Sequence, residues 1–194
     1  MQIVESWENF DFDNHVFFNS NHEVKALTSP IIKHFGLNFF QYYKIFQDGS
    51  NILLTTCPNW ARYCYETQLY NHSFFLTKPS GYFKHEIFVA RNLSSIDKQS
   101  DMIDTIKRKF GITPIITITN PVHDGCEFFS FGTSICDETI TLNTCIAHID
   151  LLEKFIIYFK DKAQELIKKA HENRIKIKDM VTIDPNNQPT IGCD

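Results

Sequence analysis

Two short turns, each flanked by strand-like residues, constrain the fold more than any other feature of this sequence. The first, Gln47–Ser50, separates "LNFFQYYKIF" from "NILLTT", and the second, Asp124–Gly125, separates "PIITITN" from "CEFFSFGT". Aromatic and β-branched residues favour strands, and Asp-Gly pairs favour tight turns. Each turn therefore predicts a β-hairpin, and two hairpins commit the chain to an antiparallel arrangement of strands.

Helical patterns precede, separate and follow the hairpins. Residues 21–36 carry apolar side chains at three- and four-residue steps, with Asn21 to begin a helix, Gly36 to end it and Pro30 to kink or split it. Further helices are predicted over residues 59–69, from Ser94 or Ser95 to Gly111, and as one long helix over residues 143–171.

A fifth strand, "GYFKHEIFVA", completes a recognisable order of elements. We therefore predict an α/β fold, an α-β-α sandwich in which helices cover a five-stranded, mainly antiparallel sheet. Such a sheet can enclose a cavity where helices straddle one face. Residues 1–20 are expected to form an N-terminal extension, residues 21–172 the domain, and residues 173–194 a C-terminal linker or tail.

Composition and local sequence argue against several functional classes. The formal net charge of −4 is unlike that of a domain that binds nucleic acid by itself. The first residues, "MQIVESWENFDFDN", lack the basic and apolar regions of a signal peptide, and no apolar run approaches the ~18 residues of a membrane span. Six cysteines without a C-x-x-C pair indicate free thiols in a reducing cytoplasm.

The common catalytic and cofactor motifs are also missing, so we expect no enzyme, no cofactor and no metal site. Neither a phosphate-binding glycine loop nor a zinc-protease or nucleophile-elbow motif is present. His123, Asp124 and Cys126 lie close together and could suggest a Cys/His nucleophile. Such a site needs spatial geometry rather than adjacency, so a Cys/His enzyme stays a remote alternative.

Three stretches resemble the N-terminal signal-binding domain of LuxR-type transcription regulators. They are "HFGLNFFQYYKIFQDGSNILLTTCPNW", "CEFFSFGTS" and "HIDLLEKFIIYFKDKAQELI", and the order of elements agrees over residues 24–169. The resemblance implies an autoinducer-binding-domain-like fold, related to PAS and GAF domains. It also implies an aromatic-lined cavity, which in that family binds acyl-homoserine lactones during quorum sensing.

The resemblance assigns roles to individual residues. Trp60 matches the family tryptophan that hydrogen-bonds the lactone carbonyl, and Ser130 matches a serine or threonine that touches the ligand. Thr56, Cys64, Ser73 and Phe74 stand where the family has tyrosine, tyrosine, aspartate and proline. A serine in place of the aspartate is a weaker, uncharged acceptor for the amide of the family's ligand. The resemblance therefore implies a ligand other than a standard acyl-homoserine lactone.

Helix and strand periodicity adds candidates to this set. Helical spacing places Trp60 on one face with Tyr63 or Cys64, and this face could either line a cavity or simply pack against the core. Alternation along the first hairpin strand points Tyr43 inward, with Phe39, and Tyr42 to the other face. Phe39 and Phe128 are assigned to the plain core. The predicted ligand-binding residues are Trp60, Tyr43, Tyr63, Cys64, Ser73 and Ser130.

The sequence as a whole predicts a ligand-sensing regulatory domain of a LuxR-like transcription regulator, binding a small, largely apolar molecule. DNA would be reached only through a helix-turn-helix domain that these residues do not contain. The chain could be a stand-alone domain or a piece of a longer regulator. The alternative is a ligand-free protein–protein interaction or dimerisation module. Leu151, Ile157 and Tyr158 could form a homodimer contact or be buried beneath the N-terminal segment.

Overall fold

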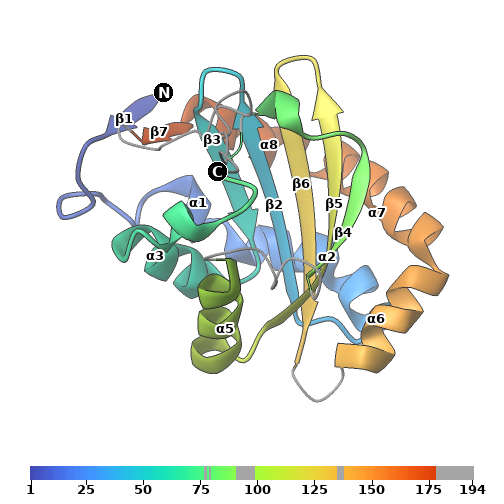
Figure 1. Ribbon diagram of the computed structural model, residues 1–194. Helices are drawn as coiled ribbons and strands as arrows, with labels where there is room; N and C mark the ends of the chain where they lie inside the picture. The colour runs from blue at the N-terminus through green and yellow to red at the C-terminus, as the bar shows by residue number, and fades with distance from the viewer. Residues whose placement is uncertain (77, 79, 91–98, 135–137, 178–194) are drawn as a thin grey trace, which may run out of the picture.

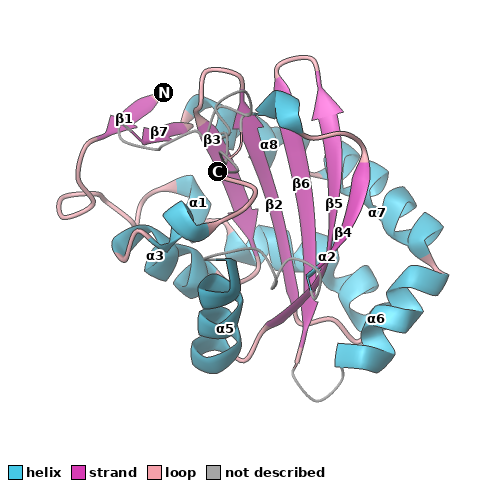
Figure 2. Cartoon of the chain, in the orientation of Figure 1, coloured by secondary structure: helices cyan, strands magenta, loops and turns pink. Residues whose placement is uncertain are grey.

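A seven-stranded mixed sheet forms the centre of the protein (Figures 1 and 2). The computed structural model describes residues 1–76, 78, 80–90, 99–134 and 138–177. The strands lie in the order β1-β7-β3-β2-β6-β5-β4. Their bounds are β1 Gln2–Val4, β2 Phe39–Phe46, β3 Asn51–Thr55, β4 Glu86–Val89, β5 Thr113–Val122, β6 Gly125–Thr133 and β7 Ile175–Ile177.

Helices cover both faces of this sheet (Figure 1). They are α1 Val16–Asn19, α2 Asn21–Phe35, α3 Pro58–Glu66, α5 Gln99–Phe110, α6 Glu138–Ala147, α7 Ile149–Lys162 and α8 Gln164–Glu172, with 3-10 turns at Leu69–His72 and Ser80–Tyr82. Helices α2, α6, α7 and α8 lie on one face, and α3 and α5 lie on the other (Figure 1). The predicted α-β-α layering is therefore present.

Alternation along β2 divides its side chains between two cores. Phe40 and Tyr42 point toward α7, where both rings lie against Phe159. Phe39 points the other way and packs with Trp60 of α3. Both sets are buried because each face of the sheet is covered, so β2 is apolar almost throughout.

The prediction of a five-stranded sheet is wrong in its strand number. All five predicted strands are present and pair antiparallel. The sheet gains β1 and β7, which pair with each other in parallel, and β7 joins β3 through Asn51 and Ile175. Each added strand has only three residues. Three residues are too few to show an alternating pattern in sequence. The predicted N-terminal extension and C-terminal tail thus each supply a strand.

Three helix predictions also need correction. Helix α2 runs unbroken through Pro30, which is exposed, so water can solvate the carbonyl that a proline leaves unpaired. The single helix predicted over residues 143–171 is divided into α6, α7 and α8, with breaks at His148 and Ala163. Helix α3 ends before residue 69, since Gln68 takes a left-handed conformation with φ of 55°. Ser94 and Ser95 lie outside the described residues.

His15 ties the N-terminal segment to the end of α8. Its Nδ1 accepts a hydrogen bond from the backbone N–H of Phe17, so the neutral ring carries its proton on Nε2. That N–H donates to the carbonyl of Asn173 at 3.0 Å. Burial lowers the pKa of His15, although the Asn173 carbonyl and the Asp11 carboxylate act in the opposite direction.

This arrangement predicts a histidine-dependent loss of stability in acid. The unfolded chain binds a proton at position 15 more readily than the folded protein, so the free energy of unfolding falls as pH drops below about 6.5. Urea denaturation at several pH values should show a shallower fall for His15→Asn, which keeps a capping acceptor but does not titrate. An unchanged pH slope in this variant would contradict the prediction.

Candidate ligand-binding site

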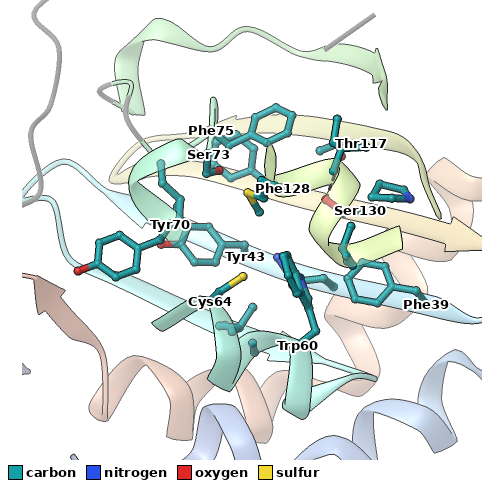
Figure 3. A pocket seen from close by; sticks show the side chains of 18 of the residues that line it. Phe39, Tyr43, Trp60, Cys64, Tyr70, Ser73, Phe75, Thr117, Phe128 and Ser130 are labelled. Carbon is teal, nitrogen blue, oxygen red and sulfur yellow. Dashed lines mark hydrogen bonds between the residues drawn. The ribbon is translucent and has the colours of Figure 1, made fainter. Parts of the chain in front are cut away.

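A cavity of about 110 Å³ lies between the sheet and the helices α3 and α5. Figure 3 shows Trp60 rising from α3 toward Tyr43 and Phe39 of β2, with Ser73, Phe75 and Phe128 around the same space. The described residues that line it are Phe39, Gln41, Tyr43, Leu53, Trp60, Ala61, Cys64, Tyr65, Tyr70, Ser73, Phe75, Leu76, Ala90, Met102, Ile103, Ile106, Pro114, Thr117, Phe128 and Ser130.

Strand register brings the sheet side of this lining together. Gln41 of β2 lies opposite Ser130 of β6, and Tyr43 lies opposite Phe128. Because side chains alternate along a strand, these four project to the same face. The helical side comes from α3, where Trp60 and Cys64 stand one turn apart.

The structure brings five of the six predicted site residues to this cavity. Trp60, Tyr43, Cys64, Ser73 and Ser130 all line it. Their role as ligand contacts stays a prediction, because proximity to a cavity is not binding.

Tyr63 is the predicted residue that lies elsewhere. Its ring packs on Phe110, and its hydroxyl accepts a hydrogen bond from Lys109 Nζ at 2.9 Å. Helical spacing allows both the third and the fourth residue after Trp60 to share its face, and here the fourth, Cys64, turns into the cavity.

The plain-core assignment of Phe39 and Phe128 was incomplete. Both are buried, at 3% and 2% exposure, and both also line the cavity. Gln41 and Thr117 also line the cavity, although neither was predicted to do so. Gln41 shares its strand parity with Phe39 and Tyr43, so the same alternation would have found it.

Few polar groups face the cavity, and one of them is an indole N–H. Trp60 is 2% exposed. Within the described part of the chain, its Nε1 makes no hydrogen bond. A buried indole N–H usually finds a partner, so this donor is available to a guest. Ser73, at 3% exposure, stands on the opposite side of the cavity in Figure 3 and is already engaged with other residues.

A second polar group of the lining is the hydroxyl of Tyr43 in β2, which lies near Tyr65 of α3. Tyr65 donates from its hydroxyl to Asn51 Oδ1 at 3.2 Å. The Tyr43 hydroxyl is near that of Tyr65 but meets no partner with hydrogen-bond geometry among the described residues. Burial, followed by the neighbouring Tyr65 hydroxyl, raises the pKa of Tyr43 well above its usual value. Tyr43 is therefore a neutral hydrogen-bonding group at any physiological pH.

Among the described lining residues there is no Asp, Glu, Lys, Arg or His; they are aromatic or aliphatic, or carry a hydroxyl, thiol, thioether or amide group. An ion moved into such surroundings would lose its hydration without gaining a counter-charge. The chemistry of this cavity therefore suits an uncharged, mainly apolar guest.

Thiol chemistry finds little support in the geometry. Burial raises the pKa of Cys64, and it raises the pKa of Cys126 to about 12, so neither thiol ionises readily. The side chain of His123 is 94% exposed, whereas Cys126 is fully buried, so this pair is not assembled as nucleophile and base. The four described cysteines are free, and residues 1–76, 78, 80–90, 99–134 and 138–177 hold no group of metal-ligating side chains.

Comparison with known proteins adds no relative, since neither a scan of protein families nor a search of curated proteins finds a match. The likeness to LuxR-type signal-binding domains thus rests on the three sequence stretches and stays a prediction. Among the described helices, none is both long enough and apolar enough to cross a membrane.

Proposed function

We propose that this chain is a ligand-sensing regulatory domain, of the kind found in LuxR-like transcription regulators, that binds a small, uncharged and largely apolar molecule. One observation carries the proposal. The cavity between α3, α5 and the sheet is lined by aromatic rings, and the indole N–H of the buried Trp60 side chain makes no hydrogen bond within the described structure. A donor of this kind fixes the orientation of a guest that the apolar walls retain.

Occupancy of the cavity supplies the regulatory effect. A guest that binds only the folded domain stabilises it in proportion to its concentration and affinity. The guest joins α3 and α5 to the sheet, since all three line the cavity. A conformation in which these elements are close together is therefore favoured, and a dimer or a DNA-competent state could depend on it.

Ser73 supports a ligand other than a standard acyl-homoserine lactone. It lines the cavity at the position where the resemblance places an aspartate. A carboxylate accepts an amide N–H about twice as strongly as a neutral group does. If a panel of such lactones raised the melting temperature strongly, and Trp60→Phe abolished the shift, this part of the proposal would be wrong.

Native mass spectrometry of the freshly purified protein tests the proposal. We expect an excess mass of small-molecule size in the wild type and a smaller bound fraction in Trp60→Phe, which keeps an aromatic ring but removes the donor. Loss of one buried hydrogen bond should weaken binding by about five- to tenfold.

Trp7→Phe is the matched control for this experiment. Trp7 also donates from its indole, but to the Tyr70 hydroxyl at 3.3 Å, and it does not line the cavity. This variant should retain the excess mass. Absence of any bound molecule in the wild type, together with no stabilisation by apolar guests of ring size, would overturn the proposal.

A dimerisation module is the second candidate, and one surface favours it. Ile157 and Tyr158 of α7 are 70% and 42% exposed, whereas Leu151 is half-buried. Exposed apolar side chains of this size are common at interfaces. A concentration-dependent dimer that Ile157→Glu disperses, in a protein with no bound small molecule, would favour this alternative.

A further inference from the structure

A row of polar side chains crosses the floor of the cavity. Gln41 of β2 lies opposite Ser130 of β6, and Ser130 lies opposite Thr117 of β5. All three line the cavity. They interrupt a surface that is otherwise formed mainly by rings and aliphatic side chains, so they mark where the polar end of a guest would lie.

The neighbours of Gln41 are already paired with other groups. On one side, the hydroxyls of Ser130 and Thr117 bond to each other at 2.9 Å. On the other side, Thr55 lies opposite Gln41, but its hydroxyl donates to the Phe40 carbonyl and accepts from the Cys57 N–H. The Gln41 side chain is partly buried, and its amide makes no hydrogen bond to the residues that the structure describes.

An unpaired amide at the wall of an apolar cavity calls for a complementary group. A side-chain amide presents a donor and an acceptor next to each other. A carboxamide, lactam or imide meets both at once. A carboxylate offers acceptors only, and an ammonium group offers donors only. Either would bring a charge next to described lining residues that carry no counter-charge.

We propose that Gln41 determines ligand specificity by pairing with a neutral carboxamide-type group at the polar end of the ligand. This inference rests on the proposed ligand-binding function of the same cavity. The Ser130–Thr117 pair lies beside that group, and the rings of Phe39 and Phe128 pack against the apolar remainder. A cavity of about 110 Å³ is comparable to engineered protein cavities that hold one benzene ring, so the apolar remainder is about one ring in size.

Four ring-sized probes test this inference by calorimetry on the full chain. Benzamide carries the carboxamide, toluene has no polar group, benzoate is an anion and benzylammonium is a cation. Benzamide should bind at least tenfold more tightly than either ion. Gln41→Met preserves the length of the side chain but not its hydrogen bonds, so it should weaken benzamide about tenfold and leave toluene unchanged.

Gln47→Met is the matched control. Gln47 is the residue after β2, and its amide donates to the His123 carbonyl at 2.9 Å, outside the cavity. It should bind all four probes as the wild type does. Equal loss of benzamide and toluene in Gln41→Met would show a change of packing and overturn the inference.

The outcomes separate the two proposals. If toluene and benzamide bind the wild type equally well, the cavity accepts guests but Gln41 does not select among them, and only this inference fails. If no probe binds, the proposed ligand-binding function fails as well.

Discussion

Replacing Cys64 by phenylalanine is expected to abolish small-molecule binding while the protein remains folded. Cys64 lines the cavity from α3, opposite the sheet. A benzyl group at this position would occupy most of a space of about 110 Å³, so a guest would have to displace it. We expect affinity for any cavity ligand to fall more than a hundredfold, a change of about 3 kcal/mol. Calorimetric titration with the probes described above measures it.

The same substitution should raise the melting temperature of the ligand-free protein, because filling a cavity commonly stabilises a fold. Glu66→Phe adds an equal ring to the outer surface of α3, where Glu66 pairs with Arg62 at 2.7 Å. This control should bind ligand normally. Retained binding in a folded Cys64→Phe protein would show that guests bind elsewhere.

Replacing Phe129 by alanine is expected to lower the free energy of unfolding by about 3–5 kcal/mol, the largest loss among the substitutions proposed here. Phe129 is fully buried on the α7 face of β6, and its ring lies 5.1 Å from that of Tyr42. Both faces of the sheet are covered, so the surrounding groups can relax only in part around the missing ring. Equilibrium urea denaturation measures the change in the free energy of unfolding.

Phe128→Ala, at the adjacent residue, is the variant to compare with Phe129→Ala. Phe128 points to the opposite face and lines the cavity, so its truncation enlarges the space available to a guest. This variant should accept ligands one ring larger, whereas Phe129→Ala should keep the wild-type preference. If Phe129→Ala lowered the free energy of unfolding by less than about 1 kcal/mol, the inference that β6 packs tightly against α7 would be wrong.

The hairpins were predictable because their determinants are local. The Asp-Gly turns and the aromatic, aliphatic and β-branched residues of β2–β3 and β5–β6 lie within short stretches of chain. The strands β1 and β7 were not predictable, because each has three residues and forms by pairing with segments distant in sequence: β1 with β7, and β7 also with β3. The breaks at His148 and Ala163 divide one continuous apolar stripe, which by itself favours a single helix.

The site was predictable to the extent that periodicity fixes orientation. In a strand, side chains alternate with a period of two, so Tyr43 was expected to point inward with Phe39, and the same rule leads to Gln41. Tyr42 points to the other face, as expected, but is also buried because that face is covered too. On a helix, the third and fourth positions after Trp60 both share its face, so spacing alone did not separate Tyr63 from Cys64. That choice depends on how α3 is rotated against the sheet, which is a tertiary property.

Tyr70 connects the cavity to the N-terminal segment, so binding of a guest could affect that segment. Its ring is part of the cavity wall, and its hydroxyl accepts the indole N–H of Trp7. Trp7 follows β1, whose partner in the sheet is β7, near the other end of the described chain. An outward displacement of Tyr70 would therefore be expected to disturb its hydrogen bond to Trp7, and with it the pairing of β1 with β7. Amide hydrogen exchange in β1 would then register whether the interior is empty or filled.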